Sequence, residues 1–131
     1  MLADDAATRA LDISLDRIGP GEAVAAMTVR PDMLNGHRTC HGGYIFTLAD
    51  TAFAFACNSR NRRAVAQQCS VTFLAPAREG DRLTAHATER HLVGRSGVYD
   101  VAVSSGAGPI AEFRGLSRTV SGFHRPDLEQ A

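Results

Sequence analysis

Hydrophobic and polar residues alternate along most of the second half of the chain. Between positions 83 and 93, Leu83, Ala85 and Ala87 alternate with threonine and histidine, and the same period of two recurs in three further segments. A period of two is typical of a strand with one buried face. The pattern predicts four consecutive antiparallel strands over residues 64–74, 83–93, 98–103 and 110–120. Residues 121–131 are expected to form a frayed end.

The first half of the chain changes period twice. Apolar residues at positions 7, 10, 11 and 15 have roughly helical spacing, which predicts a short amphipathic helix over residues 6–18 that ends near Gly19. Residues 22–29 alternate again and predict a strand, which Pro31 stops. The first half therefore supplies one more strand and a short N-terminal helix.

The segment between Gly43 and Asn58 has neither pattern. Its fourteen residues contain no glycine, no proline and one charge, and four of them are alanine. Length and alanine content favour a helix over a strand. Because the segment is apolar almost all round, the helix is expected to be buried on most sides.

The order of elements predicts an α+β architecture, in which an antiparallel sheet of about five strands wraps round one long central helix. The hotdog fold fits this order and the length of 131 residues. A chain of this size is expected to form a single domain, residues 1–131, with its core at about residues 20–121.

Composition narrows the classes of function. The 14 basic and 14 acidic residues give a net charge of zero, which speaks against general nucleic-acid binding. All basic residues are arginine, so there is no lysine for a Schiff base or a P-loop. Three cysteines without a CxxC motif predict neither a disulfide framework nor a zinc knuckle. With no membrane span or secretory signal expected either, we predict a cytoplasmic protein without a cofactor.

Asp50 is the first candidate for chemistry. It is the only charged residue in the apolar helix, with Phe46 and Phe53 as its neighbours one turn away on either side. A carboxylate in apolar surroundings is costly to ionise, and enzymes place one there when they need a base or a nucleophile. The alternative is a carboxylate on a small exposed stripe with Thr47, or one paired with an arginine.

His41, Gly42 and Gly43 form the second candidate, at the expected start of the same helix. Free N–H groups at a helix N-terminus stabilise negative charge, as an oxyanion hole requires. Eight residues separate Gly42 from Asp50, so both could face one cleft of about 12 Å. An ordinary glycine-rich loop remains the alternative.

Two other pairs of residues are weaker candidates for a metal site or a nucleophile. His37 and His41 have a spacing used by zinc sites on helices, but flanking glycines and the lack of further ligands argue against a metal. A nucleophile pair of Cys40 and His41 is disfavoured because adjacent side chains seldom point at each other.

Three arginines and one glutamine remain as candidates for substrate binding. Arg62, Arg63 and Arg95, the last beside Gly94 in a turn, could meet a phosphate, or lie on solvated surface. Gln68 could face the cleft or the solvent. Aromatic residues of the helix could line a pocket, although at helical spacing they more often belong to the core.

The segment HGGYIFTLADTAFAFACN at residues 41–58 closely resembles the hotdog-fold thioesterases of the phenylacetate-degradation (PaaI) type. The segments VTFLAP at 71–76, GDRLTA at 80–85, GRSGVYD at 94–100 and IAEFRG at 110–115 match as well. The resemblance covers about residues 20–121. It implies hydrolysis of acyl-CoA thioesters, often of arylacetyl groups such as phenylacetyl or hydroxyphenylacetyl, without a metal or an organic cofactor.

The resemblance also implies roles for individual residues. Asp50 would be the catalytic general base or nucleophile, and the backbone N–H of Gly42 would polarise the thioester carbonyl. Asn35 would place water or the leaving group, and His41 would shape the loop. Relatives often carry Ser or Thr near the start of the second strand, where this chain has Ala66, Gln67 and Gln68 instead. Family members are usually homotetramers built from dimers, with each active site at a dimer interface.

Three other functions remain open from the sequence. They are a hotdog dehydratase or hydratase on acyl thioesters, a non-catalytic acyl-CoA-binding module, and a thioesterase that acts on acyl-carrier protein. Release of free thiol from a panel of acyl-CoAs would mark a thioesterase, and formation of an enoyl product would mark a dehydratase.

Overall fold

The structure is a computed structural model that describes residues 4–125 and 127. In chain order its elements are α1 (Ala6–Ala10), β1 (Ser14–Gly19), β2 (Glu22–Thr28), the short 3₁₀ turn η2 (Pro31–Met33), α2 (Gly42–Cys57), β3 (Arg62–Phe73), β4 (Arg82–Val93), β5 (Ser96–Ser105) and β6 (Gly108–Phe123). The long helix and the five strands expected from the sequence are confirmed, each within a few residues of its predicted bounds.

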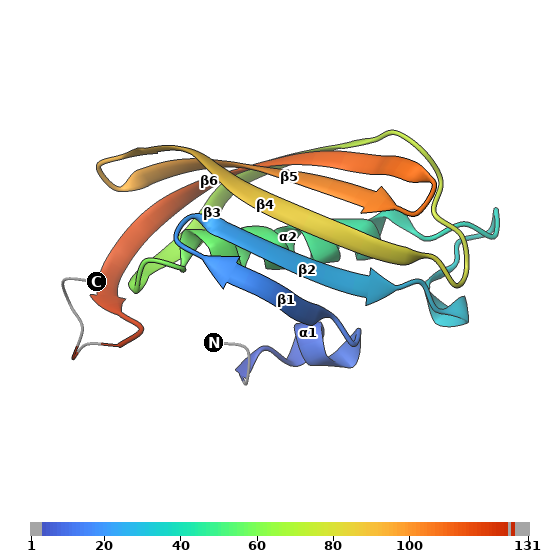
Figure 1. Ribbon diagram of the computed structural model, residues 1–131, viewed down its shortest axis with the longest axis horizontal. Coiled ribbons are helices and arrows are strands. Elements are labelled where there is room, and N and C mark those ends of the chain that lie inside the picture. The colour runs from blue at the N-terminus through green and yellow to red at the C-terminus, as the bar shows by residue number, and fades with distance from the viewer. Residues whose placement is uncertain (1–3, 126, 128–131) are drawn as a thin grey trace.

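The strands form one antiparallel sheet in the order β1-β2-β4-β5-β6-β3. Figure 1 shows the sheet curving over α2, with the helix along its concave side. The connection from α2 takes the chain to the far edge of the sheet, so β3 lies beside β6 rather than beside β2. The two edges of the sheet are therefore β1 and β3.

The core lies between α2 and the sheet. Leu48, Ala49 and Ala52 are fully buried on the inner face of the helix. The ring of Phe53 packs over Gly115 of β6, where an added Cβ would lie 2.7 Å from the ring. Gly115 is therefore needed for the close approach of helix and sheet. Small residues on both layers let a 16-residue helix fit within the curve of the sheet.

The N-terminal helix is shorter than the sequence predicts. The expectation of a helix over residues 6–18 is wrong beyond Ala10, because Leu11 ends α1, Asp12 adopts a left-handed conformation at φ 53°, and β1 follows. Ser14 to Gly19 pair with β2, which adds a sixth strand to the expected five. Backbone pairing along the edge of β2 outweighs the helical spacing of a few alanines and leucines.

The C-terminal segment is also more ordered than expected. Strand β6 continues to Phe123, and the backbone N–H of His124 donates to the carbonyl of Asn61 at 3.0 Å. The prediction of a frayed end is wrong for residues 121–124. The part of that prediction that concerns residues 126 and 128–131 lies outside the described residues.

Candidate active site

Asp50 lies on the outer face of α2, turned away from the buried core. It is half-buried at one end of a pocket of about 390 Å³, which we call the Asp50 pocket. The pocket is formed by the outer face of α2, the first half of β3 and the end of β6. Its lining residues are Asp50, Phe53, Ala54, Cys57, Asn58, Arg63, Ala64, Val65, Ala66, Val120 and His124.

The surroundings of Asp50 disfavour its negative charge. Burial raises the pKa of its carboxyl above the usual 3.8, and the nearby carboxylate of Asp5 raises it further. Asp5 is held in place as the N-cap of α1, where its side chain accepts a hydrogen bond from the Thr8 N–H at 3.0 Å. A carboxylate that is poorly solvated and faces a pocket is a stronger base than one in water.

The first turn of α2 leaves one backbone donor available. His41 is the N-cap residue, and its Nδ1 accepts a hydrogen bond from the Gly43 N–H at 2.9 Å. The Gly42 N–H, by contrast, has no acceptor within the described part of the chain. A free N–H at the start of a helix is a donor for a developing negative charge. His41 therefore serves as the cap of α2, and its expected role in the active site stays a prediction.

Gly42 lies against the end of β3. A Cβ at this position would be 2.8 Å from Cζ of Phe73, so the ring covers the backbone here. A second pocket of about 460 Å³, the Gly42 pocket, opens beside it. It is lined by Thr39, Cys40, Gly42, Ile45, Phe73, Leu74, Ala75, Pro76 and Ala77.

The chain does not bring Asp50 and Gly42 into one pocket. The two residues line different pockets, beside opposite ends of β3. Eight residues of helix separate them by about 12 Å along its axis. An attacking base and an oxyanion donor must both lie within about 3 Å of the reacting groups. Within one chain, the two candidates are too far apart to act on the same thioester.

Asn35 organises the loop before α2. Its side-chain oxygen accepts from the backbone N–H groups of His37 at 2.9 Å and Thr39 at 3.2 Å, and from the Thr39 hydroxyl at 3.3 Å. These contacts fix the path of the chain toward His41. The part that the resemblance implies for Asn35 in placing water stays a prediction.

The candidate substrate-binding residues are dispersed. Arg63 lines the Asp50 pocket, whereas the guanidinium of Arg62 lies over the ring of Phe123 at 5.8 Å. Gly94 and Arg95 form the turn between β4 and β5, and Gln68 is exposed on β3. Gly43 lines a third pocket, beside α1, together with His41 and Tyr44. Their roles in binding stay predictions.

The cysteines lack the properties of nucleophiles. Burial raises the pKa of the Cys40 thiol to about 11 and that of Cys57 to about 12. Thiols with such values stay protonated near neutral pH. The described residues hold no cluster of three or more His, Cys, Asp or Glu side chains that could bind a metal ion.

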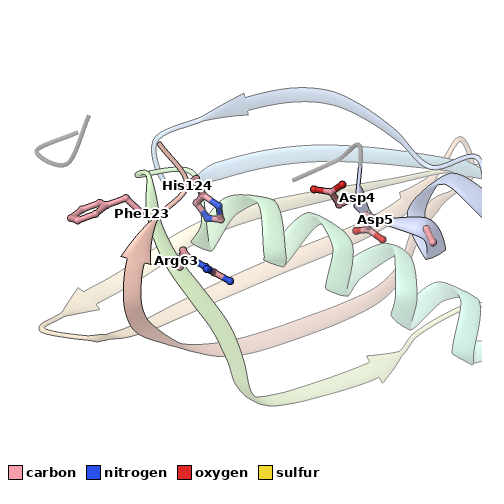
Figure 2. A pocket seen from close by; sticks show the side chains of 6 residues that line it. Asp4, Asp5, Arg63, Phe123 and His124 are labelled. Carbon is pink, nitrogen blue, oxygen red and sulfur yellow. The ribbon is translucent and has the colours of Figure 1, made fainter. Parts of the chain in front are cut away.

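Sequence reasoning missed the contact between His124 and Asn58 at the far end of the Asp50 pocket. The His124 ring nitrogen Nε2 lies 2.6 Å from Oδ1 of Asn58, the C-cap residue of α2. Figure 2 shows a neighbouring pocket that His124 and Arg63 also line, with these two residues over the C-terminal end of α2 and Asp4 and Asp5 further toward its N-terminus. Asn58 and His124 are 66 positions apart in the chain, so no local pattern signals this contact.

Comparisons with known proteins identify the class. The family model of the Thioesterase superfamily matches residues 37–111. The acyl-coenzyme A thioesterase PaaI of Escherichia coli is 48% identical over 123 residues, which cover 93% of this chain and 88% of that protein. The chain belongs to the Thioesterase superfamily, and it is a thioesterase with the hotdog fold, as the sequence predicted.

Solved structures agree with this assignment. The structure of E. coli PaaI, from the phenylacetic acid degradation operon, superposes with a TM-score of 0.92 at 47% identity, over 94% of this chain and 90% of that one. A mutant of the phenylacetic acid degradation protein PaaI from Thermus thermophilus gives 0.86 at 40%, over 88% and 100%. A Streptococcus mutans protein bound to acetyl-CoA gives 0.81 at 25%, over 86% and 91%.

Proposed function

We propose that this thioesterase carries out its chemistry at Asp50, with the Gly42 N–H of a second copy of the chain as the oxyanion donor. The enzyme hydrolyses acyl-CoA thioesters to a free acid and CoA. The acyl group we propose is phenylacetyl or hydroxyphenylacetyl, as the resemblance implies. The observation that carries the proposal is the half-buried carboxylate of Asp50 in an otherwise mainly apolar pocket, where its pKa is raised.

The chemistry needs only a base and an oxyanion donor. As general base, Asp50 takes a proton from water while the water oxygen bonds to the thioester carbon, and the carbonyl oxygen gains negative charge. As nucleophile, its carboxylate would form an anhydride that water then cleaves. In both routes the Gly42 N–H stabilises the oxyanion, and the C–S bond breaks to release the CoA thiolate. A thiolate leaves readily, so no strong acid is required.

A second copy of the chain would bring the Asp50 carboxylate and a Gly42 N–H close together. In a two-fold symmetric dimer, residue i of one subunit meets residue j of the other, and the reverse contact occurs as well. Two copies that place Asp50 of one beside Gly42 of the other would therefore form two equivalent sites. This arrangement supports the expectation of an active site at a dimer interface.

Strand β3 supports the same interface. It is a 12-residue strand at the edge of the sheet, and within the described part of the chain it pairs only with β6. Val65, Phe73 and Leu74 are about half exposed, at 51%, 51% and 53%. Long apolar edge strands readily pair with another chain. We therefore place the partner subunit on β3 and α2, and we propose, from the resemblance, that two such dimers form a homotetramer.

A mixing experiment tests the shared site. Asp50→Asn and Gly42→Val each damage both sites of a homodimer, and Gly42→Val also forces the Phe73 ring aside. Differently tagged subunits of the two variants are co-expressed and mixed dimers are purified. In a mixed dimer one site carries both defects and the other carries neither, so we expect about half of the wild-type activity. No recovery of activity in mixed dimers would show that each site lies within one chain.

The reaction itself is tested with a panel of acyl-CoAs and a thiol-trapping reagent. Phenylacetyl-CoA and hydroxyphenylacetyl-CoA should release CoA thiol faster than medium-chain acyl-CoAs. An enoyl product would instead indicate a dehydratase, and binding without turnover a non-catalytic module. A preference for acyl-carrier protein over CoA would indicate the remaining alternative.

Two further predictions concern the binding of the CoA phosphates and the location of the protein in the cell. We propose that Arg62, Arg63 and Arg95 meet the CoA phosphates, because guanidinium groups bind phosphate through paired hydrogen bonds. Among the described residues, no helix has the length and apolar character to cross a membrane. The cytoplasmic location stays a prediction.

A further inference from the structure

Helix α1 lies beside the first half of α2, on the outer face that carries Asp50. The two helices and the residues that flank them line one pocket of about 550 Å³, formed by Ala7, Ala10, Leu11, His41, Gly43, Tyr44 and Thr47. Thr47 precedes Asp50 by about one turn of helix. Figure 2 shows Asp5 over α2, on the side of α1 that is nearer to His124. The start of α1 is therefore directed along α2 toward the Asp50 pocket.

Hydrogen bonds at both ends of α1 fix the position of Asp5. Its side chain accepts from the Thr8 N–H at 3.0 Å, as the N-cap of α1. At the other end, the Arg30 guanidinium donates to the carbonyl of Ala10 at 3.1 Å and forms an ion pair with Asp12 at 3.4 Å. Asp5 is half-buried, so solvent screens its charge only in part. The chain thus holds a carboxylate at a defined place beside α2.

The space beside Asp5 adjoins the Asp50 pocket. Asp5 lines a pocket of about 640 Å³ together with Asp4, Ala6, Arg63, Phe123 and His124. Arg63 and His124 also line the Asp50 pocket, so the two pockets share these side chains. Burial raises the pKa of Asp50, and the charge of Asp5 raises it further, which agrees with this geometry.

The other groups that face Asp50 do not neutralise its charge. Within the described part of the chain, no arginine or histidine forms an ion pair with it. The Cys57 thiol of α2 and the Cys69 thiol of β3 have raised pKa values and stay uncharged near neutral pH. Burial and the guanidinium of Arg63 lower the pKa of His124, so its ring is neutral near pH 7. Arg63 thus acts mainly on the far end of the pocket, whereas the carboxylate at the start of α1 acts on Asp50.

We infer that Asp5 is a positioning residue for the hydrolysis, whose fixed negative charge keeps the Asp50 carboxylate a strong base toward water or a strong nucleophile toward the thioester carbon. The inference rests on the proposed function, since it requires Asp50 to carry out the chemistry. A like charge nearby disfavours ionisation, so Asp50 binds a proton more strongly than it would alone. The inference also gives α1 a part in the reaction, although α1 precedes the segment that matches the family model, which begins at residue 37.

The test is the pH dependence of an Asp5→Asn enzyme. Asparagine caps a helix about as well as aspartate, so this change removes the charge and keeps the cap. With phenylacetyl-CoA and dithiodipyridine, which traps thiols at low pH, kcat/KM is measured near pH 5 and near pH 8. Protonated Asp50 cannot act as a base, so the activity near pH 5 depends on how strongly it holds its proton.

Asp5→Asn should raise the ratio of kcat/KM near pH 5 to that near pH 8 about threefold over the wild type, the size of an interaction between two partly exposed charges. Near pH 8 its kcat should fall by about twofold, because a weaker base transfers protons more slowly. Titration of His124 or of the substrate affects both enzymes alike and cancels in the comparison.

Three further variants separate the charge from the structure. Asp5→Ser, a second neutral cap, should repeat the rise, whereas Asp5→Glu, which keeps the charge, should retain the wild-type ratio. Asp16→Asn makes the same change in net charge on the exposed part of β1 and should also retain it. A wild-type ratio in both neutral Asp5 variants, or an equal rise in Asp16→Asn, would overturn the inference. Near-native activity of Asp50→Asn would instead overturn the proposed function.

Discussion

The two faces of α2 differ in what they contact. The inner face carries Leu48, Ala49 and Ala52, all fully buried against the sheet. The outer face carries Thr47, Asp50, Ala54 and Cys57, which are half-buried and line pockets. The inner residues have little freedom to change because the core is already filled, whereas the outer residues face space that a substrate or a second subunit can occupy. Core packing and the proposed chemistry are thus separated by about half a turn of helix.

The largest effect is expected on the outer face. Asp50→Asn removes the proposed base without changing the size of the side chain, and should lower kcat about 10²–10⁴-fold. Thiol release from an acyl-CoA measures this loss, and size-exclusion chromatography should show the assembly unchanged. An Asp50→Asn enzyme with near-native kcat would remove Asp50 from the mechanism.

The inner face should respond in stability instead. Leu48→Ala removes most of a fully buried side chain and leaves a cavity in its place. It should lower the free energy of unfolding by about 2–5 kcal/mol. Urea denaturation followed by circular dichroism measures the change. Thr47→Ala, one residue earlier on the outer face, is the control and should lower the free energy of unfolding by much less. Thr47 is half-buried, and among the described residues its hydroxyl donates only to the Gly43 carbonyl, at 2.9 Å. Equal losses would break the distinction between the faces.

The start of the helix lies between these extremes. Gly42→Ala keeps the N–H donor but places a Cβ 2.8 Å from Phe73 Cζ, so the ring or the backbone must move. We expect kcat to fall about tenfold, less than the 10²–10³ that follows complete loss of an oxyanion donor. Phe73→Leu in the same chain should restore part of the rate by making room. If it restores none, the loss does not arise from this contact.

The smallest effect concerns pH. The pKa of Asp50 is raised in the folded state above its usual 3.8, so the folded protein binds more protons than the unfolded chain just above that value. The stability of the wild type therefore falls as pH rises through this window, while Asp50→Asn lacks that decrease. Thermal unfolding should show the variant more stable than the wild type at pH 7, and the difference should shrink toward pH 4. A difference independent of pH would mean that burial of the charge is not its cause.

The sequence was most informative where a pattern is local. The apolar run after Gly43 predicted α2, its single charge identified Asp50, and period-two alternation gave five of the six strands. The prediction failed where distant pairing decides. Ser14 to Gly19 form a strand because β2 offers an edge, although the spacing of the preceding residues is helical. His124 meets Asn58 because β6 extends past its expected end, and no local periodicity encodes that contact.

By itself, the sequence determined the class of fold, the thioesterase motif and the two candidate groups for catalysis, because these depend on periodicity and on residue types that lie close together in the chain. Only the tertiary structure decided that Gly42 and Asp50 line separate pockets and that His124 stands at the end of the Asp50 pocket opposite Asp50. The physical reason is that a helix fixes the distance between its own residues, about 12 Å over eight positions. Which surfaces face those residues depends on how the strands pair.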